Sequence, residues 1–282
     1  MLTKKLISSV LGLAICGLAF SGCSTTSNTA TTTPKTNATK ITIDGSTSVY
    51  PLMTSLVDAY TAENKNVDIE VEQGGSGVGI QDAQTGKVDI GMSSRDLNDS
   101  EKGLTTNTVC LDGIAVIVNS NNKVTNLTMD QLKKIYTFEI TNWKQLGGED
   151  HAISVVTREA TSGTRGAFEE LVLGKDVKID EKKCAAVANS TGNVAQTVQS
   201  DKYAIGYISL GSLESYTVNA LNINSVKATA DNVINGTYKL SRPFLLVTAK
   251  EPTGAVKSFI DWIKTSDKAQ QIIKDEKYII KK

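Results

Sequence analysis

Three short turns of Gly, Ser and Thr carry the residues of this chain that are best suited to chemistry. They are residues 45–48 (Gly-Ser-Thr-Ser), 74–77 (Gly-Gly-Ser-Gly) and 161–164 (Thr-Ser-Gly-Thr), and Arg158 lies just before the third. Each turn precedes a segment with the apolar spacing of a helix. A helix N-terminus carries unpaired N–H groups and a partial positive charge, and Ser and Thr hydroxyls add donors. Three such turns and one arginine together predict a site for a small oxyanion.

The same residues argue against an enzyme. His151 is the only histidine of the chain and lies in a Gly-rich loop, so neither a zinc site nor a Ser-His-Asp triad can be assembled. No Gly-x-Ser-x-Gly or Gly-x-x-x-x-Gly-Lys-Ser/Thr motif occurs. We therefore expect a binding protein that needs no metal and no cofactor. Acidic and basic residues balance at 30 each, so we expect no nucleic-acid partner.

The first 40 residues are expected to lie outside the fold. Two lysines precede an apolar run over residues 6–20, which is too short to span a membrane and has the length of a signal-peptide core. Residues 20–23, which end at Cys23, resemble the lipobox of bacterial lipoprotein precursors. That resemblance implies a signal peptide over residues 1–22, lipid attachment to Cys23, a disordered tether over 23–40 and an extracytoplasmic, membrane-anchored protein. The alternative is a plain secretory signal with an incidental cysteine.

Apolar periodicity predicts an α/β fold in the rest of the chain. Strands over 41–43, 67–72 and 88–92 alternate with helices over 51–60 and 80–83, which is typical of a parallel sheet with ligand groups at the carboxyl ends of its strands. We further expect strands at 153–157 and 204–208, a helix capped by Thr128, and helices over 166–173, 193–199 and 256–263. Two fully apolar strands, 114–118 and 244–248, are natural crossings between lobes. Lobe I would comprise 41–117 and 243–282, and lobe II 118–242, with the ligand in the cleft.

Four side chains outside the turns also carry expectations. Cys110 and Cys184 stand alone in apolar contexts, which favours buried free thiols and leaves a disulfide as the alternative. Arg165 is expected on the outer face of its helix. For Arg95 two interpretations stay open: it faces the cleft, or it pairs with Asp96 or Asp99.

The ordered motifs resemble those of one family, the phosphate-binding lipoprotein of the bacterial high-affinity phosphate ABC importer. The resemblance covers nearly everything after the tether. Its parts are residues 44–51, 74–80, 89–95, 142–143, 158–164, 205–207 and 240–243. It implies a two-lobed periplasmic-binding-protein-like fold (type II), in which each lobe is a mixed sheet flanked by helices and two strands cross between the lobes.

The resemblance also implies which residues bind phosphate. Carried over by position, they are Thr47, Ser48, the backbone at Val49, Ser76, Ser94, Arg158, Ser162, Gly163 and Thr164, with Ser46 and Arg95 as further candidates. Two positions depart from the best-known form of the site. Ser94 stands where that form has an aspartate that accepts the proton of the ligand, and Ala160 stands where it has an aspartate that pairs with the arginine. Candidate replacements for these carboxylates are Asp44, Asp96 and Glu159.

The implied function is the capture of phosphate and its delivery to an ABC permease and ATPase complex by a monomeric protein. Two alternatives stay open. The ligand is another tetrahedral oxyanion, such as sulfate, molybdate or tungstate, or the protein is a surface phosphate sensor or adhesin.

Overall fold

A mixed sheet runs through the described part of the chain, residues 38–280 of a computed structural model. The strands are β1 (Thr39–Gly45), β2 (Val67–Val71), β3 (Ile90–Ser93), β4 (Thr105–Asn119), β5 (Asn126–Leu127), β6 (Ser154–Arg158), β7 (Ala186–Ala188), β8 (Ala204–Ser209), β9 (Val218–Ala220), β10 (Asn222–Ile223) and β11 (Ser241–Thr248). Within these residues the strand order is β2-β1-β3-β11-β4-β8-β6-β7, β9 also pairs with β4, and β5 pairs separately with β10. Strand β1 is parallel to β2 and β3, which confirms the predicted β-α-β-α-β unit.

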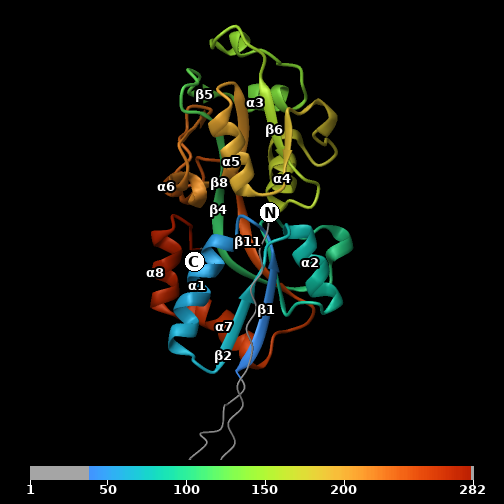
Figure 1. Ribbon diagram of the computed structural model, residues 1–282, viewed down its shortest axis with the longest axis vertical. Helices are drawn as coiled ribbons and strands as arrows, with labels where there is room; N and C mark the ends of the chain where they lie inside the picture. The colour runs from blue at the N-terminus through green and yellow to red at the C-terminus, as the bar shows by residue number, and fades with distance from the viewer. Residues whose placement is uncertain (1–37, 281–282) are drawn as a thin grey trace, which may run out of the picture. The chain divides into compact units, whose positions relative to one another are not determined.

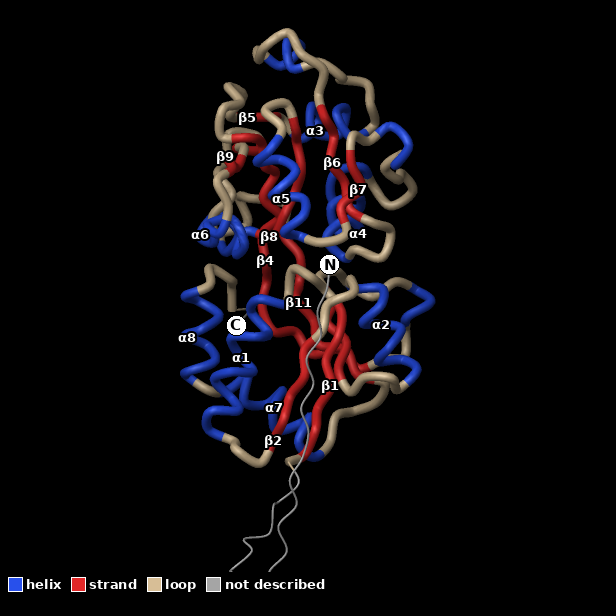
Figure 2. The backbone as a smooth tube through the Cα atoms, viewed as in Figure 1, coloured by secondary structure: helices blue, strands red, loops and turns tan. Residues whose placement is uncertain are grey.

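Helices flank this sheet, as Figures 1 and 2 show. They are α1 (Tyr50–Glu63), α2 (Ser76–Thr85), α3 (Met129–Tyr136), α4 (Gly163–Phe168), α5 (Thr191–Ser200), α6 (Ala230–Ile234), α7 (Gly254–Thr265) and α8 (Asp267–Asp275). The predicted capping box at α3 is confirmed, because Thr128 Oγ1 accepts from Gln131 N at 3.1 Å and Gln131 Oε1 from Thr128 N at 2.8 Å. Helix α4 begins three residues before the predicted start at 166 and continues as a π-helical turn over Glu169–Leu173.

Four hydrophobic clusters of the described residues, two in each lobe, define the two lobes. Lobe I is the part built around β1–β3, α1, α2, α7 and α8, and lobe II is the part built around β6–β8 and α3–α6. Alternation along single strands gives each lobe an apolar layer on both faces of its sheet. In β11, Phe244 packs with α1 and α7 while Leu245 packs with α2, and in β4 Val116 and Ile117 likewise serve opposite faces.

Strands β4 and β11 connect the lobes (Figure 1). The first half of β4 pairs with β11 and its second half pairs with β8, so one strand belongs to both cores. At the crossing, Arg242 and Asp112 are cross-strand partners and form a buried ion pair at 3.0 Å. Asp112 Oδ1 also accepts from Ser209 Oγ at 2.9 Å. Burial raises the pKa of the Asp112 carboxyl although Arg242 opposes that shift.

The sequence also made predictions about the N-terminal segment and the cysteines of the chain. The predicted signal peptide, Cys23 and the tether up to residue 37 lie outside the described residues, and β1 begins at Thr39, two residues before the predicted start of the strand at 41. Among residues 38–280, no helix is long and apolar enough to cross a membrane. Cys110 and Cys184 are free thiols, as predicted, although only Cys110 is fully buried.

Candidate functional site

All three Gly/Ser/Thr turns begin helices, as the sequence predicts. They precede α1, α2 and α4. Only α4 has the expected hydroxyl cap, where Ser162 Oγ accepts from Arg165 N at 3.3 Å. The N-caps of α1 and α2 are Val49 and Gly75, which make no side-chain cap. The hydroxyls around the first two turns are therefore not consumed by capping.

Three buried serines of lobe I lie side by side. Ser46 Oγ donates to Ser94 Oγ at 2.9 Å, and Ser76 Oγ lies 3.3 Å from Ser94 Oγ. They come from three segments, namely the end of β1, the start of α2 and the residue after β3. This is the arrangement expected where parallel strands end at the same edge of a sheet. Two predicted site residues, Ser76 and Ser94, and the further candidate Ser46 thus meet.

A second set of hydroxyls meets across the two lobes. Ser48 Oγ lies 2.8 Å from Thr164 Oγ1 and 3.0 Å from Thr191 Oγ1, and Thr47 Oγ1 lies 3.2 Å from Thr191 Oγ1. We call these four residues and the three serines of lobe I the hydroxyl cluster: Ser46, Thr47, Ser48, Ser76, Ser94, Thr164 and Thr191. Each is at most 7% exposed. Hydroxyls from both lobes therefore face one another in a region shielded from water.

The backbones of the two lobes are also in contact at the second turn. Gly77 N donates to Thr161 O at 2.9 Å. A Cβ on Gly163 would lie 2.7 Å from Ser76 Cβ and 2.8 Å from Ser94 Oγ, so any side chain there would collide with the opposite lobe. Gly75, at a φ of +96°, has Thr161 and Glu159 within 3.3 Å of its own Cβ position. The predicted residue Gly163 thus lies against the hydroxyl cluster.

Arg158 is the buried cation of the site region, with 1% exposure. Its Nε and Nη2 donate to the two carboxylate oxygens of Glu159 at 2.8 and 2.7 Å, and Nε also reaches Ala188 O at 3.3 Å. Bidentate pairing fixes the plane of a guanidinium group. Of the three candidate carboxylates, Glu159 is therefore the one that pairs with Arg158.

The other two candidate carboxylates lie elsewhere. Asp44 is 7% exposed, its Oδ1 has no hydrogen-bond partner, and it lines a pocket with Glu72, Asp82 and Lys87. Burial raises the pKa of the Asp44 carboxyl, and the neighbouring acidic groups add to that shift. Asp96 is exposed. Neither hydrogen bonds to the hydroxyl cluster.

For Arg95 the structure favours the cleft-facing interpretation, because Arg95 lines a groove between the lobes, and for Arg165 it overturns the expected position on an outer face. Arg95 pairs with neither Asp96 nor Asp99 through their carboxylates: its Nη1 and Nη2 donate to Glu101 at 2.7 Å each. Arg165 is buried rather than on an outer face, because Glu169, Glu181 and the Arg158 and Ile179 carbonyls surround its guanidinium. Arg165 thereby stabilises the strand end that carries Arg158.

Two further predicted residues have separate roles. Val49 N donates to Ser46 O at 3.1 Å, so that its N–H closes the turn before α1. Ser162 caps α4 and also lines a groove of about 760 Å³ between the lobes. The walls of this groove come from Arg95–Asp99 on lobe I and from the start of α4 on lobe II.

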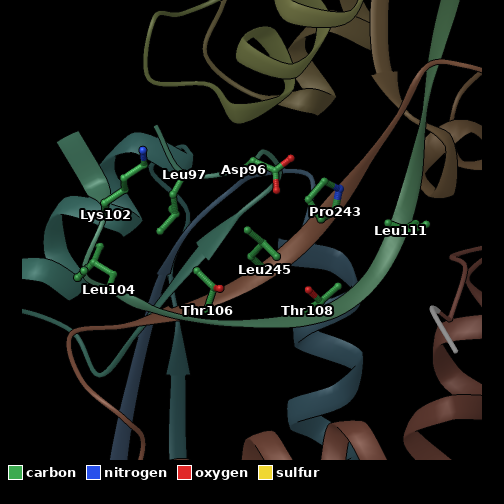
Figure 3. Close-up of a pocket in the computed structure, with 10 residues that line it drawn as sticks. Asp96, Leu97, Lys102, Leu104, Thr106, Thr108, Leu111, Pro243 and Leu245 are labelled. Carbon is green, nitrogen blue, oxygen red and sulfur yellow. The ribbon is translucent and has the colours of Figure 1, made fainter. Parts of the chain in front are cut away.

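A second cavity, of about 470 Å³, belongs to lobe I alone (Figure 3). Leu245 and Pro243 of β11 and Thr106 of β4 line it, with Asp96 and Lys102 from the segment between β3 and β4. Four of its lining residues are leucines, and its one basic residue, Lys102, is offset by Asp96, so the cavity offers no net positive charge to an anion. This composition does not suit an oxyanion. Among residues 38–280, no group of three His, Cys, Asp or Glu side chains could hold a metal ion.

One residue of the region, Thr191, escaped the sequence reasoning. Thr191 follows Ser190, which caps α5 by accepting from Asn193 N at 3.1 Å. Ser190-Thr191-Gly192 is thus a fourth Ser/Thr/Gly turn before a helix, and that pattern could have revealed it.

Two lobes joined by two strands, with buried polar groups of both lobes facing one another, define the class of cleft-closing solute-binding proteins. The chain belongs to the PBP superfamily, because the profile of that superfamily's domain matches residues 30–268.

Within this superfamily, the chain is similar in sequence to phosphate-binding proteins of two bacteria. The phosphate-binding protein PstS of Bacillus subtilis is 34% identical over 270 residues, which cover 94% of this chain and 88% of the relative. PstS of Borreliella burgdorferi is 31% identical over 85% of this chain and 89% of the relative.

Solved structures agree with these relatives. One from Clostridium perfringens, described as a phosphate ABC transporter substrate-binding protein with bound phosphate, is 44% identical with a TM-score of 0.81. It covers 86% of this chain and is itself covered completely. A phosphate transport receptor of Vibrio cholerae is 40% identical with a TM-score of 0.72 and the same coverage.

Proposed function

We propose that this protein is the extracytoplasmic phosphate-binding component of an ABC phosphate import system, which captures inorganic phosphate between its lobes and delivers it to a permease. The names of its relatives and the phosphate held by the Clostridium perfringens protein support this function. The observation that carries it is the meeting of Ser48, Thr164 and Thr191 hydroxyls across the two lobes. Such a set of donors suits an anion with several oxygens.

The proposed ligand set follows from this arrangement. It comprises the predicted residues Thr47, Ser48, Val49, Ser76, Ser94, Arg158, Ser162, Gly163 and Thr164, to which we add Thr191. Arg158 supplies one full charge, and hydroxyls and helix N-termini supply the rest. Five hydrogen bonds to a charged ligand contribute about 8–15 kcal/mol before the costs of association and closure. That sum is compatible with a sub-micromolar Kd, which corresponds to at least about 8 kcal/mol.

Phosphate would also control closure. Ser48 Oγ lies within hydrogen-bond distance of Thr164 and Thr191 across the cleft. In the proposed complex, phosphate oxygens take over these partners and connect the lobes more strongly. A ligand that contacts both lobes favours the closed state through its differential affinity. Release to a permease then requires the lobes to separate.

The remaining assignments are part of the same proposal. We propose that Cys23 carries a lipid that anchors a monomeric protein to the cell membrane, and that the protein is not an enzyme. The proposed lobe boundaries are 41–117 with 243–282, and 118–242. The pairing of β4 changes from β11 to β8 between Gly113 and Ile114, which favours a crossing a few residues before the proposed boundary at 117.

Isothermal titration with inorganic phosphate tests the binding function. We expect one site per chain, and we expect Ser48→Ala and Thr164→Ala, from opposite lobes, each to weaken binding about 10- to 100-fold. Ser55→Ala is the matched control, because this serine of α1 donates to Pro51 O at 3.3 Å and makes no hydrogen bond to the hydroxyl cluster. A dissociation constant above tens of micromolar for the unaltered protein contradicts the proposal. Phosphate uptake restored by this protein in a deletion strain distinguishes transport from sensing.

A further inference from the structure

The strand crossing between the lobes holds a buried arginine that the proposed ligand set leaves out. Arg242 lies in β11 and is 3% exposed. It pairs with Asp112 of β4, and the side chains of both residues are fully shielded from water. A buried charge pair is costly unless the remaining donors and acceptors of both partners are satisfied. The hydrogen bonds of this pair therefore show which of its groups are left over.

The carboxylate of the pair is satisfied, whereas the guanidinium is not. Arg242 Nε and Nη2 both donate to one oxygen, Asp112 Oδ2, at 3.2 and 3.0 Å. The other oxygen, Oδ1, accepts from Ser209 Oγ at 2.9 Å and from Leu210 N at 3.2 Å. Arg242 Nη1 is buried and has no hydrogen-bond partner in the described part of the chain. A guanidinium carries five N–H donors, so the edge of Arg242 that bears Nη1 keeps its donors free.

On the side of lobe I, Arg242 lies close to the hydroxyl cluster. Its Cζ is 5.5 Å from the centroid of the Phe244 ring. Strand β11 is antiparallel to β3, with Leu245 opposite Ser93. The next residues along the two strands, Phe244 and Ser94, are therefore neighbours. Only the Phe244 ring thus separates the Arg242 guanidinium from the strand end that carries Ser94.

On the side of lobe II, Arg242 is within reach of the charge of Arg158. Burial lowers the pKa of the Arg242 guanidinium, Asp112 opposes this shift, and the positive charge of Arg158 adds to it. Two buried cations that repel each other are stabilised by an anion between them. Such an anion would also give the free Nη1 the partner that a buried donor requires.

We propose that Arg242 is a second cation of the phosphate site and that its free Nη1 donates to the bound anion. This inference rests on the proposed function, because it takes phosphate to bind beside Arg158 and the hydroxyl cluster. Asp112 is a positioning residue, since it acts on the anion through Arg242 and connects that arginine to Ser209 and Leu210 of lobe II. The anion would then contact a crossing strand as well as both lobes.

Asp112→Asn is the first test, because the inference predicts opposite changes in stability and in binding. The variant leaves Arg242 buried without a charged partner, so the melting temperature without phosphate should fall. Phosphate would replace the lost negative charge, and we expect titration calorimetry to give a dissociation constant about tenfold lower than that of the unaltered protein. A merely structural role of the pair would weaken binding or leave it unchanged, and either result overturns the inference.

The double variant Asp112→Leu with Arg242→Met is the second test and removes both charges at once. Apolar residues of similar volume can replace a buried ion pair without loss of stability, so this variant should fold. It lacks the Nη1 donor, and we expect its dissociation constant for phosphate to rise about tenfold or more, as for a lost hydrogen bond to a charged ligand. An unchanged constant contradicts the inference even if Asp112→Asn does not fold.

Glu63→Gln is the matched control for the loss of a negative charge. Glu63 also pairs with a cation, Lys268, but both side chains are about half exposed on lobe I. We expect its phosphate affinity to stay within about twofold of that of the unaltered protein. A gain as large as that of Asp112→Asn would show that net charge alone is responsible and would overturn the inference. Failure of phosphate to bind the unaltered protein overturns the proposed function instead.

Discussion

Gly163→Ala should weaken phosphate binding by hindering closure of the lobes, while the stability of each lobe stays unchanged. The added Cβ would overlap Ser76 Oγ and lie 2.7 Å from Ser76 Cβ and 2.8 Å from Ser94 Oγ. These atoms all belong to lobe I, whereas Gly163 opens α4 in lobe II. Gly163 is not among the glycines with positive φ, so alanine fits its backbone without strain. The collision therefore exists only when the lobes are closed.

The size of the effect follows from the overlap. Overpacking of a tight contact costs about 1–3 kcal/mol, which here is subtracted from binding because only the closed state is affected. This corresponds to a loss of phosphate affinity of about 5- to 150-fold. The melting temperature without phosphate should stay close to that of the unaltered protein.

Titration calorimetry and thermal unfolding on the same samples measure both quantities. Gly166→Ala is a graded control, because its Cβ would meet only the flexible side chain of Arg95, with Cδ at 3.0 Å. We expect that variant to lose at most about threefold in affinity. Unchanged phosphate affinity in Gly163→Ala, or an equal fall in stability and affinity, would refute the reasoning that the two lobes close on the ligand here.

Three other predictions concern charged groups. Arg158→Met should weaken phosphate binding about 30- to 5,000-fold, which is the equivalent of the roughly 2–5 kcal/mol lost when one partner of a buried charge pair is truncated. Glu159→Gln should weaken phosphate binding less, and titration calorimetry compares the two variants. Asp112→Asn leaves Arg242 buried without a charged partner, so the protein should lose about 3–5 kcal/mol of stability, or about 6–20 °C in melting temperature. The double variant Asp112→Leu with Arg242→Met should recover most of the lost stability. Burial raises the pKa of the Asp44 carboxyl above its ordinary value of 3.8, so the native state binds the carboxyl proton more tightly than the unfolded state does. The stability of the protein therefore falls as the pH rises from 3.8 to the raised pKa. Asp44→Asn should therefore raise the melting temperature at about pH 7 and not at about pH 3, which a pH series of thermal unfolding checks.

Local patterns were sufficient to predict most of the elements of the fold. The alternation of apolar residues located β1, β2 and the helices between them, and the capping box at Thr128 located the start of α3. Continuous apolar runs predicted the two crossing strands because these strands are buried on both faces. Such signals are local, and the structure changed only their boundaries.

The partners of the charged side chains were beyond local patterns. Arg95 meets Glu101 because Asn98 caps a 3₁₀ turn that brings residue 101 back towards it. Arg165 and Glu169 are spaced four apart, which predicts their pairing. Which face of α4 is buried depends on the segment around Ile179, which packs over it.

For the hydroxyl cluster too, the sequence locates the residues but not their contacts. Each serine or threonine can be located from the sequence, since each stands next to a helix start or a strand end. The distances across the cleft, such as 2.8 Å between Ser48 and Thr164, depend on how two lobes far apart in sequence dock.

A crystal structure of the phosphate-loaded protein tests the central claim most directly. We predict one tetrahedral anion within hydrogen-bond distance of Ser48 and Ser94 on lobe I, and of Thr164 and the Arg158 guanidinium on lobe II. Phosphate bound by one lobe alone, or in the cavity beside Leu245, would contradict the claim that both lobes close on the ligand.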